Sequence, residues 1–108
     1  MRRGDIVTVS APGDYGKPRL AVIIQADAFL QAHDSVVVCL CTSFQSNAPL
    51  FRIPLEPTEE NGLQEHSDIM VDKLITMQRT KIGKKIGELD TETIKNLNRS
   101  ILLFYGLA

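Results

Sequence analysis

The side chains that most often carry out catalysis are few in this sequence, and they are spread along it. Its two histidines, His33 and His66, each stand in a polar stretch with the composition of a loop. No Ser-His-Asp set has a convincing local context, so we expect both histidines to be solvated at the surface. The sequence has no Gly-rich phosphate loop and no Cys/His cluster with ligand spacing, so it predicts no cofactor and no metal site.

The remaining reactive side chains also favour ordinary structural roles. Cys39 and Cys41 stand two residues apart in an apolar run, where they project from one face but are too far apart for an unstrained disulfide. We expect both to be small buried side chains in a reduced, cytoplasmic protein. Glu56, Glu59 and Glu60 lie in a loop-like stretch and are interpreted as solvated charge.

Charge and hydropathy exclude several classes of protein. The 108 residues include 12 Lys and Arg and 13 Asp and Glu, which gives a formal net charge of −1. Proteins that wrap a long duplex are usually strongly basic, so any contact with nucleic acid here should be short and local. The N-terminus has no apolar signal segment, and every apolar run is far shorter than the roughly 20 residues of a membrane helix. We therefore expect no membrane partner.

Short apolar runs separated by turn residues predict a mostly β protein. The expected strands cover residues 6–10, 20–25, 35–41, 51–55, 67–71 and 80–89. Pro54 cannot donate to a ladder, which places its strand at a sheet edge, and Gly83 and Gly87 predict bends or bulges in the last strand. Residues 11–18 and 56–65 are loops, and residues 26–33 predict a helical turn with Phe29 facing inward.

The C-terminal segment predicts one amphipathic helix. Asp90 is a suitable N-cap and Gly106 follows the last turn. The apolar stripe that should pack on the sheet consists of Ile94, Leu97, Ile101 and Phe104. Strands followed by a single helix predict a compact barrel or curled sheet, in one domain spanning 1–108. A core of this size is marginal on its own, which favours dimerisation.

Several segments, taken in order, resemble the PemK/MazF toxins. They are residues 3–7 (RGDIV), 16–27 (GKPRLAVIIQAD), 38–43 (VCLCTS), 67–74 (SDIMVDKL) and 86–90 (IGELD). The resemblance implies an SH3-like β-barrel of the CcdB/MazF type with a C-terminal helix, in a homodimer. It also implies a cognate antitoxin, whose C-terminal segment occupies the RNA groove.

The resemblance further implies a sequence-specific endoribonuclease that cuts single-stranded RNA, including mRNA, without a metal or other cofactor. In that reaction the 2′-hydroxyl attacks the neighbouring phosphate and leaves 2′,3′-cyclic phosphate and 5′-hydroxyl ends. Arg19 and Thr42 match the family's catalytic arginine and threonine. A guanidinium offers planar donors to the oxygens of a phosphorane, and a threonine hydroxyl adds one more. Since a guanidinium keeps its proton, we expect Arg19 to stabilise charge, and the general base stays open.

Other candidates for RNA binding flank these two residues. Tyr15 and Lys17 precede Arg19 and could offer a stacking face and a phosphate contact, although a tyrosine in such a loop equally serves as a packing anchor. Ser43 and Gln45 follow Thr42 and could read base edges or cap a turn.

The sequence departs from the family at one place. Some members carry an Arg and an Asp just after the fifth strand, where this chain has Ile75 and, two or three positions on, Met77 or Gln78. Lys73 and Gln78 are the candidates that could replace these charges in part. Sequence specificity, and with it the acid/base pair, stays open at this point.

Two alternatives from other functional classes stay open. Toxins of the same fold poison DNA gyrase by binding alone, through an apolar C-terminal tail with an aromatic residue. Residues 103–108 (LFYGLA) offer such a tail, although the helix stripe already assigns Phe104 to the core. The other alternative is an inactive homologue that only binds RNA or its antitoxin. Arg19 and Thr42 together favour the nuclease.

Overall fold

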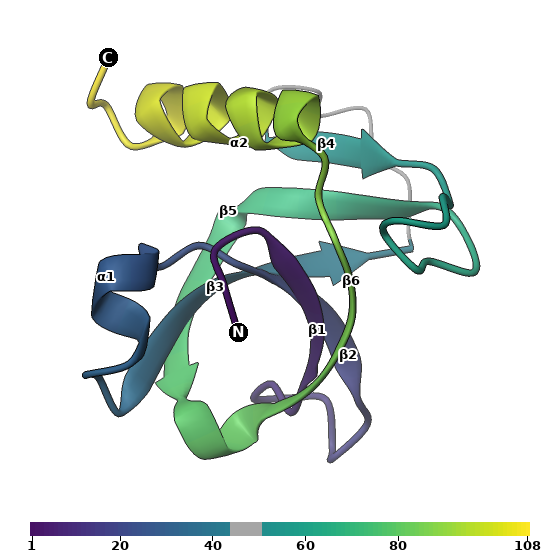
Figure 1. The fold of residues 1–108 in the computed structure, drawn as a ribbon, viewed down its shortest axis with the longest axis vertical. Coiled ribbons are helices and arrows are strands. Elements are labelled where there is room, and N and C mark those ends of the chain that lie inside the picture. The colour runs from purple at the N-terminus through teal and green to yellow at the C-terminus, as the bar shows by residue number, and fades with distance from the viewer. Residues whose placement is uncertain (44–50) are drawn as a thin grey trace.

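A computed structural model describes residues 1–43 and 51–108 of the chain. In these residues six strands form one antiparallel sheet, in the order β4-β5-β3-β2-β1-β6, that curls into a barrel-like ring (Figure 1). The strands are β1 (Asp5–Val9), β2 (Arg19–Ile23), β3 (Ser35–Thr42), β4 (Arg52–Leu55), β5 (Ser67–Gln78) and β6 (Ile82–Glu88). The other elements are α1 (Asp27–Leu30), the 3-10 turn η1 (Arg79–Lys81) and α2 (Thr91–Phe104). The predicted fold class, a β-barrel with a C-terminal helix, is confirmed.

Irregular pairing lets the sheet curl. The β3–β5 register shifts between Cys39 and Cys41, and the β1–β6 register shifts twice. The shifts in β6 fall beside its two glycines, as expected from the sequence. Gly87 is also required by a close approach, because a Cβ there would lie 2.1 Å from the Asn61 carbonyl oxygen. The loop before β5 can therefore pack directly against β6.

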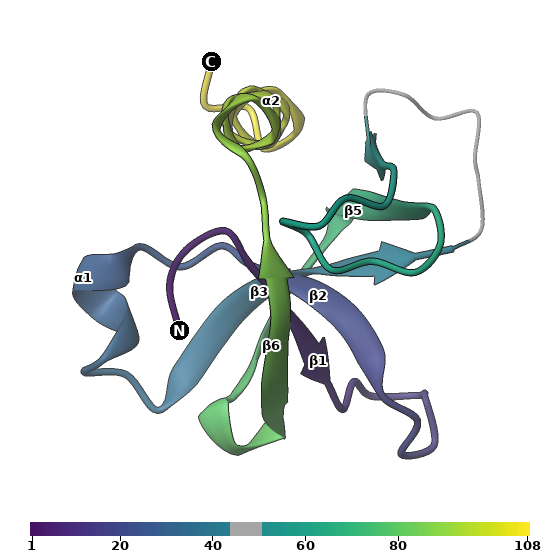
Figure 2. The same ribbon diagram turned by 45° about the vertical axis from the view of Figure 1, so that its right-hand side comes forward.

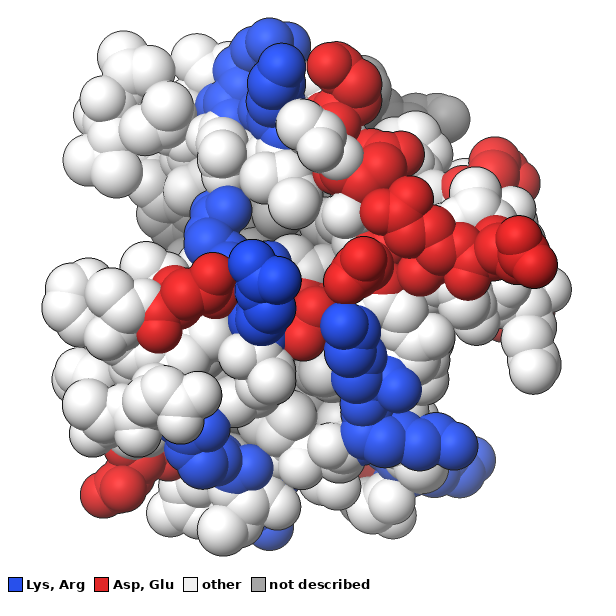
Figure 3. Space-filling view, viewed as in Figure 1, with Lys and Arg blue, Asp and Glu red and all other residues white. Residues whose placement is uncertain are grey.

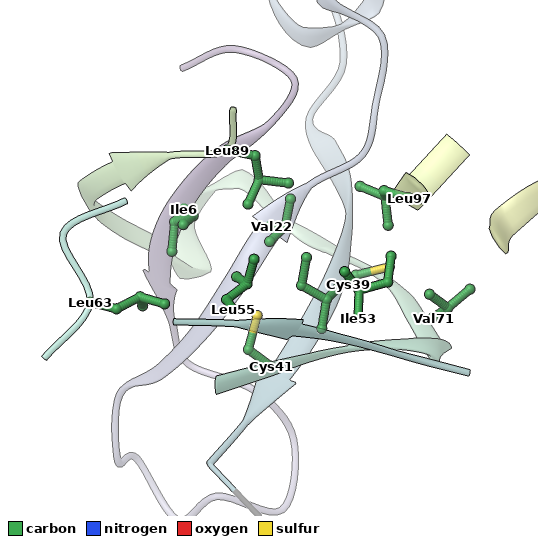
Figure 4. Close-up of a cluster of buried hydrophobic side chains, with 11 residues drawn as sticks. Ile6, Val22, Cys39, Cys41, Ile53, Leu55, Leu63, Val71, Leu89 and Leu97 are labelled. Atoms are coloured by element: carbon green, nitrogen blue, oxygen red, sulfur yellow. The ribbon is translucent and has the colours of Figure 1, made fainter. Parts of the chain in front are cut away.

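Both faces of the central strands are buried, as the apolar runs predicted. Along β1, β2 and β3, alternate side chains enter two separate clusters. One cluster joins the sheet to α2, β4 and the loop before β5, and it contains Cys39, Cys41 and Leu97 (Figure 4). The other covers the opposite face and includes Val36, Val38 and residues from α1 and the end of β5.

Helix α2 begins and ends as its sequence predicts. The Asp90 carboxylate accepts a hydrogen bond of 2.7 Å from the Thr93 amide, and this bond lowers the pKa of Asp90. At the other end, Gly106 adopts φ +74°, while the Leu107 and Gly106 amides donate to the Leu102 and Leu103 carbonyls. The helix packs against β5 and β4 and is seen nearly end-on in Figure 2.

Three predictions about the elements need correction. Phe29 does not face inward: the helix begins at Asp27, so Leu30 is buried while Phe29 is 58% exposed. Phe104 is not a core residue, since it is 39% exposed and packs edge-on against Phe51 at a ring distance of 4.9 Å. Strand β5 runs seven residues beyond the predicted 67–71, to Gln78.

No helix in the described part of the chain is long and apolar enough to span a membrane.

Candidate functional site

One hollow collects residues from three neighbouring strands. Because β2, β3 and β5 are adjacent and antiparallel, the start of β2, the end of β3 and the start of β5 meet at one edge of the sheet. The hollow there has a volume of about 300 Å³. Its lining residues are Pro18, Arg19, Leu20, Cys41, Thr42, Ser43, Glu65 and Ser67.

Arg19 is fixed in this hollow by contacts on two sides. Its Nε donates a hydrogen bond of 3.1 Å to the Cys41 carbonyl oxygen. Its Nη1 lies 3.5 Å from Oδ1 of Asp14, and the side chain is 30% exposed. The guanidinium is therefore held in a defined orientation, yet it keeps a surface open to the hollow.

Asp14 joins the site although the sequence analysis did not predict it as a site residue. It lies in the loop before β2, five residues ahead of Arg19. Among the residues that the structure describes, its Oδ2 has no hydrogen-bond partner despite being buried. Buried carboxylate oxygens are normally paired, so an orphaned one beside the predicted catalytic arginine marks a functional-site candidate.

The end of β3 supplies the other predicted catalytic residue. Thr42 is half-buried and pairs in register with Asp68 of β5, and Ser43 follows it at the surface. Both line the hollow together with Arg19. Gln45, predicted to follow them in RNA binding, lies outside the described residues.

Tyr15 and Lys17 lie in the loop that leads to Arg19. They line a second hollow of about 330 Å³, which shares Pro18 and Arg19 with the first. Tyr15 is 98% exposed and has φ +53°, a conformation that is uncommon for residues other than glycine. In this chain alone the ring is therefore not a packing anchor, and it remains a candidate for stacking on RNA.

The last two predicted RNA-binding residues lie apart from Arg19. Gln78 pairs with Ser35 at the far end of β5 and lines a third hollow, with Lys81 and with Gly16 of the Tyr15 loop. Lys73 is exposed in the middle of β5 and lines none of these three hollows. The structure thus brings Arg19, Thr42 and Ser43 together and leaves Lys73 outside the group.

His66 is not the solvated histidine that the sequence predicted. Its Nδ1 lies 2.5 Å from Oε1 of Glu56, and its Nε2 lies 2.7 Å from Oδ1 of Asp68. The carboxylate of Asp68 is almost fully buried. The prediction failed because it judged the loop by its composition, whereas the contacts join residues at its two ends. His33, by contrast, is exposed as expected.

The cysteines behave as buried apolar side chains, as predicted. Both are free, and burial raises the pKa of each thiol to about 12. Arg3 opposes this rise at Cys39, and Arg19 opposes it at Cys41. A thiol with so high a pKa carries almost no thiolate at neutral pH, so neither residue is suited to be a nucleophile.

Comparison with known proteins identifies the family. The family model described as PemK-like, MazF-like toxin of type II toxin-antitoxin system matches residues 2–105. The chain belongs to this PemK/MazF family. A curated relative, probable endoribonuclease MazF of Mycolicibacterium smegmatis, is 43% identical over 109 residues, which cover 100% of this chain and 99% of that protein.

Solved structures of MazF toxins share the fold. Mycobacterium tuberculosis toxin MazF-mt6 superposes with a TM-score of 0.83 at 20% identity, covering 96% of this chain and 98% of that one. MazF in the MazE-MazF complex (form II) from Deinococcus radiodurans gives a TM-score of 0.81 at 16% identity, covering 100% and 97%. A mycobacterial endoribonuclease in complex with its cognate antitoxin gives a TM-score of 0.83 at 18% identity, covering 100% of this chain and 97% of that one.

The departure from the PemK/MazF pattern has a structural counterpart. Met77, in the region where some members carry an aspartate, is buried in the cluster on the second face of the sheet. Ile75, at the arginine position, packs against the same cluster. These two positions support the barrel in this chain, whereas Thr76 and Gln78 beside them are exposed.

Charges of opposite sign occupy neighbouring regions of one face of the molecule. In Figure 3 acidic side chains gather over the loop before β5 and the start of α2, and basic ones gather over β6 and η1. Glu56, Glu59, Glu60 and Glu65 are the exposed acids of that loop. Glu65 brings this negative charge to the edge of the Arg19 hollow.

Sequence reasoning missed Glu65 and Ser67, which line the Arg19 hollow, and Asp14, which lines the neighbouring Tyr15 hollow and contacts Arg19. Asp14 could have been suspected from its place in the Gly/Pro loop directly before Arg19. Glu65 and Ser67 could be found only from the pairing of β5 with β3, which sets the start of β5 beside Thr42. Nothing in their local sequence indicates that register.

Proposed function

We propose that this chain is an endoribonuclease toxin of a type II toxin-antitoxin system, which cuts single-stranded RNA at the Arg19 hollow without a metal. The observation that carries the proposal is the arrangement of Arg19: a guanidinium anchored on the Cys41 carbonyl, next to Asp14 and in one hollow with Thr42. Membership of the PemK/MazF family and the 43% identity to a probable endoribonuclease support it.

The proposed reaction uses the RNA's own nucleophile. The 2′-oxygen attacks the adjacent phosphorus and loses its proton, while the bond to the 5′-oxygen breaks and that oxygen takes up a proton. The products are a 2′,3′-cyclic phosphate and a 5′-hydroxyl. Because the 2′-hydroxyl already lies next to the phosphate, proximity lowers the barrier, and the protein mainly has to stabilise charge on the phosphorane.

Arg19 and Thr42 supply that stabilisation in our account. The guanidinium keeps its charge at every relevant pH and can donate to two phosphorane oxygens at once. Thr42 lines the same hollow and can donate its hydroxyl to a non-bridging oxygen. The rigid ends of β2 and β3 hold both residues, so little reorganisation is needed during the reaction.

Asp14 is the best candidate for the general base. It contacts the charge-stabilising arginine through Oδ1 and keeps Oδ2 without a partner in the described part of the chain. A carboxylate can accept the 2′-hydroxyl proton, which a guanidinium cannot. This assignment fills the role that the sequence left open.

Replacing Asp14 with asparagine should lower kcat for RNA cleavage by about 10²-fold, the lower range for loss of a general base. The amide keeps the shape and a possible contact to Arg19 but cannot take the proton. Initial rates on a fluorescent RNA at saturating concentration measure the effect. Glu59→Gln, an exposed carboxylate outside the hollow, is the matched control and should leave the rate unchanged. A rate for Asp14→Asn within twofold of wild type would rule out this role.

The shape and charge of the site suit a single strand. The hollows around Arg19 are small, and the exposed Tyr15 ring can stack on an unpaired base beside the scissile phosphate. Lys17 can contact the backbone, and Ser43 and Gln45 can meet a base edge. We propose mRNA as the substrate and a cognate antitoxin as the partner that blocks this site, in line with the antitoxin complexes of its structural neighbours.

We also expect a homodimer. The chain leaves large apolar side chains exposed at the end of α2, namely Leu102, Leu103, Phe104 and Leu107, with Phe51 beside them. Contiguous exposed apolar surface usually marks an interaction site. Light scattering at low micromolar concentration should give twice the chain mass of 12.0 kDa. A mass of one chain under these conditions would contradict the dimer.

The direct test of the proposed function is incubation of the purified protein with a long single-stranded RNA, with and without EDTA. We expect cleavage at a small set of short motifs in both reactions. Absence of cleavage would overturn the proposal, and inhibition of gyrase supercoiling by the same preparation would then favour a binding-only toxin.

A further inference from the structure

A chain of three charged side chains closes the loop that leads into β5. Glu56 stands just after β4, and Asp68 is the second residue of β5. His66 lies between them, with each ring nitrogen within hydrogen-bonding distance of one carboxylate oxygen, at 2.5 and 2.7 Å. The histidine therefore ties the end of one strand to the start of the next.

With both carboxylates ionised, this geometry favours a protonated imidazole. A neutral ring has one donor and one acceptor nitrogen, so one nitrogen would face a carboxylate oxygen with lone pairs on both atoms. The imidazolium donates from both nitrogens and neutralises the buried carboxylate of Asp68. The hydrogen bonds to Glu56 and then Asp68 accordingly raise the pKa of His66 above its ordinary value, while desolvation opposes the rise.

Glu56, His66 and Asp68 together form a clamp, which borders the wall of the Arg19 hollow. The two neighbours of His66 along the chain, Glu65 and Ser67, both line that hollow. Asp68, which His66 holds, pairs in register with Thr42. Asp68 adds to the rise in the pKa of the buried Cys41 thiol, which is due mainly to desolvation, and Arg19 opposes it.

The other contacts that anchor this loop involve no side chain that titrates near neutral pH. Asn61 caps its own loop by accepting from the Thr58 and Leu63 amides and donating to the Glu56 carbonyl. Leu63 is buried in the core. Glu65 therefore lies between an apolar anchor at Leu63 and a charged anchor at His66, and only the charged one depends on pH.

We propose that protonated His66 is a positioning residue for RNA cleavage, which holds Glu65 and Ser67 in place opposite Arg19 and Thr42. The inference rests on the proposed function of that hollow. His66 contacts neither Arg19 nor the reacting atoms and acts through the wall that it fixes. When it loses its proton, the contact to one carboxylate is lost and this wall loosens.

The sign of the pH effect follows from the groups that face His66. Glu56 from the end of β4 and Asp68 from β5 are both acidic, and the neighbouring Glu65 adds further negative charge. The cation that lines the hollow is Arg19, which is already paired with Asp14. Because the folded-state pKa is raised, the clamp is complete below the ordinary pKa of histidine, about 6.5. It is lost as pH rises through the folded-state value.

Two variants separate a charged clamp from a merely structural residue. His66→Gln retains one hydrogen bond but no charge, and we expect kcat to fall at least about tenfold near neutral pH, as for other small misplacements in an active site. His66→Arg restores a permanent cation with donors for both carboxylates, and should recover most of kcat while removing the alkaline decline. His33→Gln, at the exposed histidine, is the matched control. Melting temperatures show whether each variant is folded.

The pH profile of kcat and an NMR titration of the two histidines complete the test. We expect the His66 resonance to titrate above the ordinary histidine pKa of about 6.5, and wild-type kcat to decline over the same range. Equal kcat in wild type and His66→Gln, equal loss in both His66 variants, or a His66 pKa at or below that ordinary value would overturn the positioning role. Wild-type protein that cleaves no RNA would instead overturn the proposed function itself, and this role with it.

Discussion

Arg19→Ala is expected to reduce RNA cleavage by about 10³-fold or more, with the fold intact. A guanidinium that stabilises a phosphoryl transition state contributes effects of this size in other enzymes. Within the described part of the chain, the side chain makes one hydrogen bond to the Cys41 carbonyl and one ion pair with Asp14 of the preceding loop. Its removal therefore takes little from the core, and thermal unfolding should change only slightly.

Two further variants separate the role of the Arg19 guanidinium from a general effect of positive charge. Arg19→Lys keeps the charge but loses the planar pair of donors, so its rate should fall between those of wild type and Arg19→Ala. Arg99→Ala, at an exposed position on α2, controls for loss of positive charge and should match wild type. Cleavage by purified Arg19→Ala within about threefold of wild type would show that the site lies elsewhere.

The fold could be predicted well wherever local chemistry decides the structure. Pro54 places β4 at the sheet edge, Asp90 caps the start of α2, and the apolar runs at β2 and β3 are covered on both faces. Predictions were wrong where burial depends on the residue at which a short helix begins, or on packing by segments distant in the sequence. Phe29 is exposed because α1 is a single turn whose face depends on where it begins.

The site was predictable only in part for a related reason. Arg19 and Thr42 stand in segments that resemble the family, and the antiparallel β2–β3 pair brings these segments together. Asp14, Glu65 and the His66 clamp depend on contacts between loops and strands that are distant in sequence. Their residue types are common in exposed loops, so composition alone did not distinguish them as site residues.

The second large effect concerns the substrate. If the 2′-hydroxyl is the nucleophile, a single 2′-deoxy nucleotide on the 5′ side of the scissile phosphate removes the attacking atom and leaves every protein contact in place. We expect no detectable cleavage at that bond. RNA binding should change little, since one hydroxyl contributes little to the affinity for a single strand that is held by stacking and phosphate contacts.

Cleavage of this singly substituted RNA therefore tests the central claim most directly. The assay compares three strands of one sequence, all containing a cleaved motif: unmodified, 2′-deoxy at the scissile position, and 2′-deoxy one nucleotide further away, each with and without EDTA. The account predicts that the first and third strands are cut in both conditions, with a 2′,3′-cyclic phosphate and a 5′-hydroxyl at the new ends. It predicts that the second strand stays intact. Cleavage of the second strand at the same bond, or loss of all activity in EDTA, would contradict metal-independent attack by the 2′-hydroxyl at Arg19.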